Sequence, residues 1–195
     1  MATFRGVDYL HIDSLLSDEE KLVRQTARRF VEEKVIPVIK DCYNEGRFPA
    51  ALIPEMGEMG FFGANLEGYG CAEMSNVEYG LVMQELERGD SGLRSFASVQ
   101  GALVMYPIRT YGSEEQRQRY LPKLATGELI GCFGLTEPGF GSNPGGMTTT
   151  GRREGDEWVL NGEKTWITNG GVADVAVVWA RTPEGVRGFL VDKGT

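Results

Sequence analysis

The chain has 195 residues, 41% of them hydrophobic and 25% charged, which is enough for one large domain or two smaller ones with real cores. Its formal net charge of −8 argues against a nucleic-acid-binding surface and against adhesion to anionic lipid, because both need clustered basic residues. No apolar run approaches the roughly 20 residues of a membrane span, and residues 1–13 contain neither an apolar signal core nor an Arg-rich leader.

Cysteine and histidine are too few for most metal and nucleophilic sites. Cys42, Cys71 and Cys132 are odd in number and widely spaced, which disfavours a disulfide framework and a zinc site. His11 is the only histidine, so a Ser-His-Asp triad is nearly excluded, and we interpret His11 as a surface or packing residue. A reducing compartment fits best, either the cytoplasm or, for a processed eukaryotic protein, the mitochondrial matrix.

The N-terminal part of the chain predicts helices. Three capping boxes, each a serine followed three residues later by Glu or Gln, mark helix starts at Ser17, Ser75 and Ser113. Apolar residues recur at helical spacing after Ser17, and Pro37 is expected to end or kink that first helix. The other predicted helices cover about residues 51–59, 75–88, 95–111 and 113–121, the last ending before Pro122.

After Gly127 the pattern changes to short strands. Asn161-Gly162 is the strongest short hairpin signal in the chain, and residues 182–185 (Thr-Pro-Glu-Gly) predict a second turn. The predicted strands cover residues 129–135, 147–153, 158–160, 163–168, 175–181 and 186–191. We therefore expect an α+β chain, with an all-α helical domain over residues 1–128 followed by an antiparallel, β-barrel-like domain over residues 129–195. That sheet is expected to be incomplete, because its strands would leave an edge and an apolar face uncovered.

The segment from Cys132 to Ser142 predicts a strand that runs into a glycine-rich loop. Glycines let the backbone approach a ligand, and successive N–H groups with Thr and Ser hydroxyls can bind phosphate or carbonyl oxygens. An ordinary turn between strands is the alternative interpretation. The loop is not a P-loop, since it has no GKS or GKT, and it lacks the helix that follows a dinucleotide-binding fingerprint.

The segment Lys164–Gly171 (KTWITNGG) places an indole beside a hydroxyl and a polar turn. Such a pair suits a flat heteroaromatic ligand, because it supplies one ring contact and one hydrogen bond. The alternative is a tryptophan at a strand end that packs on the core.

The two segments in this order resemble the acyl-CoA dehydrogenase family. The segments 111–116 (YGSEEQ), 120–122 (YLP) and 127–128 (GE) resemble the same family, and the likeness runs from about Ser17 to Thr195. It implies an N-terminal helical domain, a middle β domain and a C-terminal four-helix domain. Of these, the chain is expected to supply the first and most of the second, with the four-helix domain absent.

The resemblance implies FAD as the cofactor. Thr136 is expected to hydrogen-bond the pyrimidine edge of the flavin, and Thr168 the region that accepts hydride. Gly141 and Ser142 are expected beside the ribityl-phosphate of the flavin and beside CoA. The residues implied to bind the cofactor are Phe133, Leu135, Thr136, Gly141, Ser142, Trp166, Ile167 and Thr168.

Within the family, residues 92–95 (GLRS) and 98–100 (SVQ) are similar to the glutaryl-CoA dehydrogenase branch. There, Arg94 and Ser95 are implied to face the distal carboxylate of the substrate, and Ser142 is implied to contact CoA. A guanidinium in an apolar pocket would bind a carboxylate and reject a plain fatty tail. The alternative is that Arg94 is a solvated arginine at a helix end.

Four residues in this loop depart from the family pattern. Phe140 stands where a small residue is usual, Asn143 where aspartate is usual, and Gly145-Gly146 where a pair of serines is common. Phe140 adds bulk to a tight loop and Asn143 removes a charge from it. Both changes are expected to weaken flavin binding.

The implied reaction is α,β-dehydrogenation of an acyl-CoA thioester, with glutaryl-CoA as the expected substrate and decarboxylation to crotonyl-CoA as a further step that some relatives take. The base would lie on the C-terminal domain, so we expect no catalytic residue in this chain, no metal site and no activity of the chain alone. Electron-transfer flavoprotein is the expected acceptor, and a completed protein is expected to form a homo-oligomer, as a homotetramer.

Other functions are compatible with the same residues. The chain could be a non-catalytic fragment or an assembly subunit that pairs with a second chain. It could also belong to a general short-chain acyl-CoA dehydrogenase or to an acyl-CoA oxidase-like relative. Flavin absorption of the purified chain and the reactivity of reduced flavin with oxygen separate these alternatives.

Overall fold

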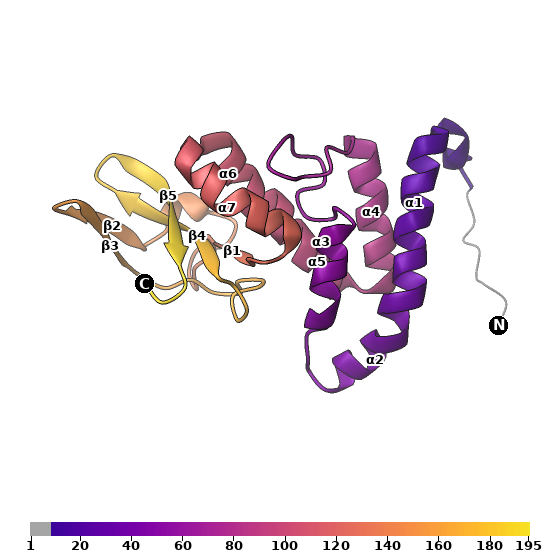
Figure 1. Cartoon of the computed structure of the whole chain (residues 1–195). Helices are drawn as coiled ribbons and strands as arrows, with labels where there is room; N and C mark the ends of the chain where they lie inside the picture. The colour runs from indigo at the N-terminus through magenta and orange to yellow at the C-terminus, as the bar shows by residue number, and fades with distance from the viewer. Residues whose placement is uncertain (1–8) are drawn as a thin grey trace.

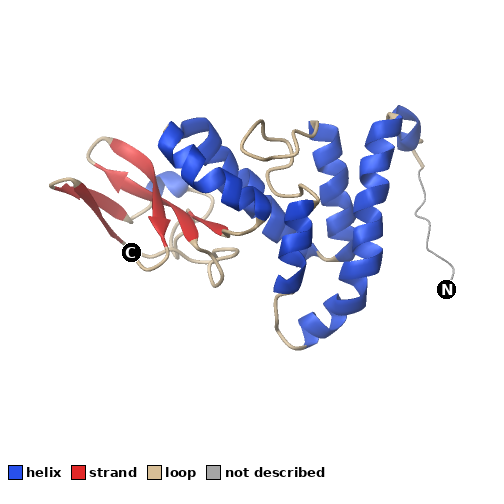
Figure 2. Cartoon of the chain, in the orientation of Figure 1, coloured by secondary structure: helices blue, strands red, loops and turns tan. Residues whose placement is uncertain are grey.

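A computed structural model of the chain describes residues 9–195. Residues 1–8, and with them most of the segment in which we predicted no targeting leader, lie outside the described residues. The helices form one end of an elongated molecule and the strands form the other (Figures 1 and 2). Helices α6 and α7 lie beside the sheet, where the Tyr120 hydroxyl of α7 donates to Asp192 over 2.9 Å.

Helices occupy the chain up to Gly127, as predicted. π-Helical turns over Val31–Val35 and Val99–Met105 join α1 to α2 and α5 to α6. Within residues 9–195 the α-helices are α1 (Asp18–Phe30), α2 (Ile36–Asn44), α3 (Ile53–Glu58), α4 (Asn76–Gly89), α5 (Ser91–Ser98), α6 (Tyr106–Tyr111) and α7 (Glu114–Thr126). The strands are β1 (Gly131–Gly134), β2 (Thr150–Glu154), β3 (Glu157–Asn161), β4 (Val175–Thr182) and β5 (Gly185–Asp192).

All three predicted capping boxes are confirmed at the starts of α1, α4 and α7. At α1 the Ser17 hydroxyl accepts from the Glu20 amide at 3.2 Å, and the Glu20 carboxylate accepts from the Ser17 amide at 2.7 Å. Ser75 and Ser113 make the same reciprocal pairs. These bonds close within one helical turn, so the sequence alone could predict them.

Two prolines affect the helices differently. The first helix gives way to the π-helical turn before Pro37, which lies in the first turn of α2, where its missing N–H is least costly. The prediction that α7 ends before Pro122 is wrong, since the helix continues to Thr126. Leu121 and Leu124 are buried on either side of the proline, and this packing outweighs the lost hydrogen bond.

The sheet is mixed rather than antiparallel, which corrects the sequence prediction. Strand β4 pairs antiparallel with β5, but it pairs parallel with β1 and, through Thr150 and Arg181, parallel with β2. The chain leaves β1, forms the β2–β3 hairpin and returns so that β4 runs in the same direction as β1. Only a long crossover of this kind can place two strands parallel. Short-range sequence patterns do not predict such a crossover.

The predicted hairpin at Asn161-Gly162 is also wrong, because residues 163–168 form no strand. The hairpin joins β2 to β3, and its turn contains Gly155, whose φ is +62°. Gly162 serves a different purpose: a Cβ at this position would lie 2.6 Å from the Thr149 Cα, so only glycine allows the two backbones to approach. The predicted turn between Thr182 and Gly185 is confirmed.

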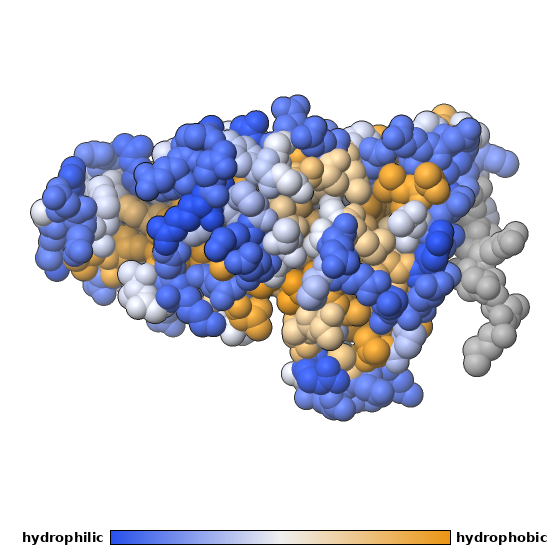
Figure 3. All heavy atoms as spheres, viewed as in Figure 1, coloured by the Kyte–Doolittle hydropathy of each residue, from blue (hydrophilic) through white to orange (hydrophobic). Residues whose placement is uncertain are grey.

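One apolar core spans the helices and reaches the sheet. Phe62, Phe96 and Leu93 are fully buried in its helical part, and Val175 and Val177 of β4 extend it into the sheet. Apolar atoms nevertheless remain on the surface between the helical part and the sheet (Figure 3). In the part of the chain that the structure describes, no helix is both long enough and apolar enough to cross a bilayer.

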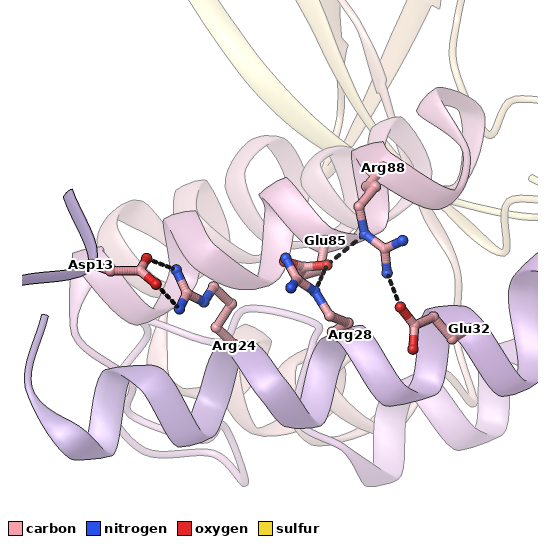
Figure 4. A network of polar contacts seen from close by, with 6 residues as sticks. All are labelled: Asp13, Arg24, Arg28, Glu32, Glu85 and Arg88. Carbon is pink, nitrogen blue, oxygen red and sulfur yellow. Dashed lines mark hydrogen bonds and ion pairs between the residues drawn. The ribbon is translucent and has the colours of Figure 1, made fainter. Parts of the chain in front are cut away.

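A buried carboxylate links α1 to α4. Glu85 of α4 is 1% exposed and accepts from Arg28 of α1 at 2.7 Å and from Arg88 at 2.8 Å (Figure 4). Burial would raise the pKa of Glu85, but the two guanidinium groups hold it below its ordinary value. Glu85 is therefore a structural carboxylate that stabilises the packing of α1 on α4.

Candidate functional site

The structure brings the two predicted motif segments side by side, although they are far apart in the sequence. Leu135 and Thr136 follow the carboxyl end of strand β1, where both are half-buried. The Thr136 carbonyl accepts from the Thr165 amide at 2.9 Å, and the Leu135 carbonyl accepts from Lys164 Nζ at 3.0 Å. The segment that contains Trp166 thus runs directly along the loop that follows β1.

Phe133 lies on the face of the sheet that is turned toward the helical part. Its ring meets that of Trp179 on β4 edge-to-face, with centroids 6.0 Å apart. Phe133 therefore packs against β4 on one side and stays half-buried.

Glu137 and Lys164 form a buried ion pair between the two segments. Lys164 Nζ lies 2.8 Å from Glu137 Oε1, with the two side chains 11% and 2% exposed. The carboxylate also accepts from the Thr148 amide at 2.6 Å, the Thr148 hydroxyl at 2.8 Å and the Thr149 amide at 2.9 Å. Burial opposes ionisation of Glu137, but Lys164 and the two amides hold its pKa far below the ordinary value. A carboxylate bound in this way cannot serve as a general base at neutral pH.

The glycine-rich loop after β1 turns tightly and then opens to solvent. The Glu137 and Phe140 backbones exchange hydrogen bonds of 3.2 and 3.0 Å across the turn. Gly141 and Ser142 are exposed beyond it. A ligand can therefore reach their backbone and the Ser142 hydroxyl.

Phe140 and Gly146, two residues that we expected to depart from the family pattern, fit each other in the structure. The Phe140 ring occupies the space that a Cβ at position 146 would need, so Gly146 is the residue that lets the ring lie there. Asn143 lies beside the same position, with its amide nitrogen 3.2 Å from the space that such a Cβ would fill. Phe140 thus packs against its own loop. Sequence analysis treated the two changes separately, because no sequence pattern predicts that residues 140 and 146 are in contact.

Trp166 does not pack on the core. The alternative interpretation, a tryptophan at a strand end that packs on the core, is therefore wrong. Its side chain is 90% exposed and its backbone is left-handed, with φ +58°. A tryptophan seldom has both features without a partner surface. Thr168 is also exposed, whereas Ile167 is half-buried.

Asn169 fixes the far end of this segment. Its side-chain amide donates to the Gly131 carbonyl at 3.1 Å and to the Phe96 carbonyl at 3.4 Å. The backbone of Asn169 is left-handed, with φ +67°, a conformation that asparagine tolerates better than most residues. Sequence reasoning did not single out this residue, whose contacts reach both β1 and α5.

An open pocket of about 580 Å³ lies beside the second segment. Ile167 and Thr168 line it together with Phe48, Pro49 and Phe96 of the helical part. Sequence reasoning missed Phe48 and Pro49, because they come from the connection between α2 and α3 and only the tertiary fold places them here. The pocket combines apolar side chains with an exposed hydroxyl, as ligand sites usually do.

Arg94 and Ser95 lie on α5 and are half-buried. Arg94 Nε lies 2.6 Å from Glu87 of α4, and its Nη1 lies 3.4 Å from the Ser98 hydroxyl. With 36% of its side chain exposed, Arg94 is neither sealed in the core nor free in solvent. A carboxylate ligand at this position would compete with Glu87 for the guanidinium.

Metal and thiol chemistry receive no support. No group of His, Cys, Asp and Glu that could hold a metal ion occurs among residues 9–195. The three cysteines are free, and burial raises the pKa of Cys71 to about 11. His11 is exposed, and its carbonyl accepts from Ser14. The buried carboxylates of the described chain, Glu85 and Glu137, are both paired with cations.

Comparison with known proteins matches the chain to two family models. Residues 17–128 match the N-terminal domain of acyl-CoA dehydrogenases, and residues 132–195 match their middle domain. The chain is 38% identical over 186 residues to the mitochondrial short-chain specific acyl-CoA dehydrogenase of Bos taurus, covering 92% of this chain and 45% of the relative.

Two crystal structures of glutaryl-CoA dehydrogenase from Mycobacterium smegmatis share the fold. One is 56% identical with a TM-score of 0.93, over 94% of this chain and 48% of that one. The other, in complex with FADH2, is 53% identical with a TM-score of 0.93, over 95% and 48%. The chain therefore spans about half the length of these relatives.

Proposed function

The chain belongs to the acyl-CoA dehydrogenase family, and on that premise we propose that it binds FAD and an acyl-CoA thioester as part of an enzyme for α,β-dehydrogenation. In this proposal residues 1–128 form the helical domain and residues 129–195 the β domain. The observation that carries it is the juxtaposition of two segments: the loop after β1 and the segment with the exposed Trp166 run side by side, joined by the Thr165–Thr136 hydrogen bond.

The residues present fit FAD. An exposed indole in a left-handed backbone, an exposed Thr168 hydroxyl and a half-buried Thr136 lie on two segments that are bonded together. When bound, FAD would supply the acceptor for the β-hydride of the substrate. Phe133, Leu135 and Thr136 would meet it from one segment and Trp166, Ile167 and Thr168 from the other. Exposed Gly141 and Ser142 would meet phosphate groups.

Removal of the α-proton needs a positioned base. Glu137 and Glu85 are both neutralised by cations, so neither suits that role. As the family resemblance implies, we propose that the base comes from outside residues 9–195. A polypeptide of these 195 residues alone should show no turnover of glutaryl-CoA and should retain flavin weakly through gel filtration.

Glutaryl-CoA is the substrate that we propose. Arg94 is half-buried on α5, its nearest partner is a single carboxylate, and Ser95 lies next to it. A guanidinium in this setting can exchange Glu87 for the distal carboxylate of a glutaryl chain and form a bidentate pair with it. Ser142 is proposed to contact the CoA part of the same substrate.

A second candidate function is general short-chain acyl-CoA dehydrogenation. The Arg94–Glu87 pair favours it, because an arginine satisfied within the protein could be purely structural. A non-catalytic subunit that assembles with a second chain is the third. If the chain belongs to either dehydrogenase, electron-transfer flavoprotein would accept the electrons. The completed protein would form a homotetramer in a reducing compartment, such as the cytoplasm.

The decisive experiment completes the chain with the C-terminal half of the M. smegmatis glutaryl-CoA dehydrogenase and measures kcat/KM with a dye acceptor. A preference of at least roughly tenfold for glutaryl-CoA over butyryl-CoA is expected, from one charge-assisted contact. A preference for butyryl-CoA would support the short-chain enzyme. Absence of flavin absorption together with absence of activity would support the non-catalytic subunit.

A further inference from the structure

We propose that the buried Glu137–Lys164 ion pair is a positioning element that holds the two candidate flavin-binding segments in their binding arrangement. Neither residue belongs to the set expected to touch the cofactor. The pair would act through its neighbours, Thr136 on one side and Thr165 to Thr168 on the other. The inference rests on the proposed function only for the identity of the ligand.

The contacts of the pair reach three separate stretches of chain. Lys164 Nζ joins the Glu137 carboxylate at 2.8 Å to the Leu135 carbonyl at 3.0 Å, both in the loop after β1. The carboxylate in turn holds the Thr148 and Thr149 amides, at 2.6 and 2.9 Å, where the chain approaches β2. The ion pair is thus the point at which the loop, the approach to β2 and the Trp166 segment meet.

These contacts restrain the backbone of Thr136 from both sides. The preceding carbonyl, that of Leu135, is held by Lys164, and the carbonyl of Thr136 itself is held by the Thr165 amide. The direction of the Thr136 side chain therefore depends on Lys164 staying in place. A site of this kind loses precision when its supporting residues become mobile.

The Trp166 segment has little else to hold it. Trp166 is 90% exposed with φ +58°, so its ring does not pack on the core, and residues 163–168 belong to no strand, so no sheet ladder fixes this stretch. The Asn169 contacts hold one end, and Lys164 with the Thr165 amide holds the other. Releasing Lys164 should free the segment between them.

Burial makes the pair sensitive to the loss of either member. The side chains are 2% and 11% exposed, so a lone charge left behind would be poorly solvated. A neutral side chain at one position should therefore displace the other, and the three stretches would lose their common anchor.

The first test needs no cofactor. Amide hydrogen exchange is measured by NMR in the purified chain and in Lys164→Met, Glu137→Gln and Lys164→Arg variants. We expect the Thr165 amide to exchange about tenfold faster or more in Lys164→Met, while amides shared by β4 and β5 keep their rates. Lys164→Arg keeps the charge, so its Thr165 amide should exchange at a rate between those of the unmodified chain and Lys164→Met.

The second test titrates FAD and follows the quenching of its fluorescence. The dissociation constant for FAD is expected to rise about tenfold in Lys164→Met and Glu137→Gln and less in Lys164→Arg. Glu85→Gln is the matched control: it removes an equally buried ion-paired carboxylate in the helical part, and it should lower stability without changing the dissociation constant.

Each outcome decides between positioning and plain stabilisation. Lower stability in Lys164→Met with unchanged Thr165 exchange, or with an unchanged dissociation constant, overturns the inference. If Lys164→Met unfolds, as judged by the β4 and β5 amides, the same two readouts in Lys164→Arg decide. If the unmodified chain binds no FAD at all, the proposed function fails, and the Thr165 exchange rates alone decide whether the pair positions the segments.

Discussion

The side-chain oxygen of Gln100 accepts a hydrogen bond from the Gly131 amide at 2.8 Å, which joins the helical part to the first residue of β1. The side-chain nitrogen of Gln100 donates to the Leu124 and Leu129 carbonyls at 2.9 and 2.8 Å. Gln100 is fully buried, in the π-helical turn between α5 and α6. The Gln100 side-chain amide therefore bonds to α7, to the connection after it and to the first strand of the sheet.

Replacing Gln100 with methionine should lower the free energy of unfolding by about 2–4 kcal/mol, because the Gly131 amide and the Leu124 and Leu129 carbonyls each lose a hydrogen bond to this buried side chain while the volume is nearly kept. Urea denaturation followed by circular dichroism measures the change. Gln118→Met, on the exposed side of α7, is the control and should cost less than about 0.5 kcal/mol. A loss below about 1 kcal/mol in Gln100→Met would show that this amide does not join the two parts.

Phe140 and Gly146 should prove energetically coupled. Gly146→Ala alone should destabilise the chain by about 1–3 kcal/mol, because the new methyl overlaps the Phe140 ring. In a Phe140→Ala background the same change should cost almost nothing, since the ring is gone. Thermal unfolding of the four members of this double-mutant cycle measures the coupling. Additive effects would mean that the ring and the glycine do not depend on each other.

The stability conferred by Glu137 should depend on pH in one direction. Its folded-state pKa is depressed below the reference value of 4.5, so its contribution is fully present above that value and is lost as pH falls below it. At pH 7, Glu137→Gln should be less stable than the unmodified chain by about 3 kcal/mol or more. The difference should stay constant down to about pH 5.5 and then shrink. Urea denaturation of both proteins between pH 7 and pH 3 measures it, and a difference that does not vary with pH would contradict the prediction.

Arg94 should discriminate between substrates in the completed enzyme. If it binds the distal carboxylate, Arg94→Ala should lower kcat/KM for glutaryl-CoA by about 2–4 kcal/mol, or roughly thirty- to a thousandfold, and spare butyryl-CoA. Arg94→Lys should give an intermediate defect specific to glutaryl-CoA, because it keeps the charge but loses the fork. Arg152→Ala, on the exposed face of β2, is the control. Equal losses with both substrates would remove the glutaryl-CoA assignment.

The sequence by itself determined the features whose partners lie within one turn of the chain. Ser17, Ser75 and Ser113 begin helices because each finds its hydrogen-bond partner three residues later. The turn between Thr182 and Gly185 is local in the same sense. The change from helices to strands after Gly127, and the two motif segments, could also be predicted, because periodicity and turn chemistry are properties of short windows.

The tertiary structure decided everything that depends on residues distant in the chain. The helix passes through Pro122 because its neighbours are buried, and β4 lies parallel to β1 because a long crossover returns it there. The Glu137–Lys164 pair arises where the loop after β1 meets the Trp166 segment. A propensity or a cap is a local free energy, whereas burial and ion pairing are settled only when distant segments exclude water from one another.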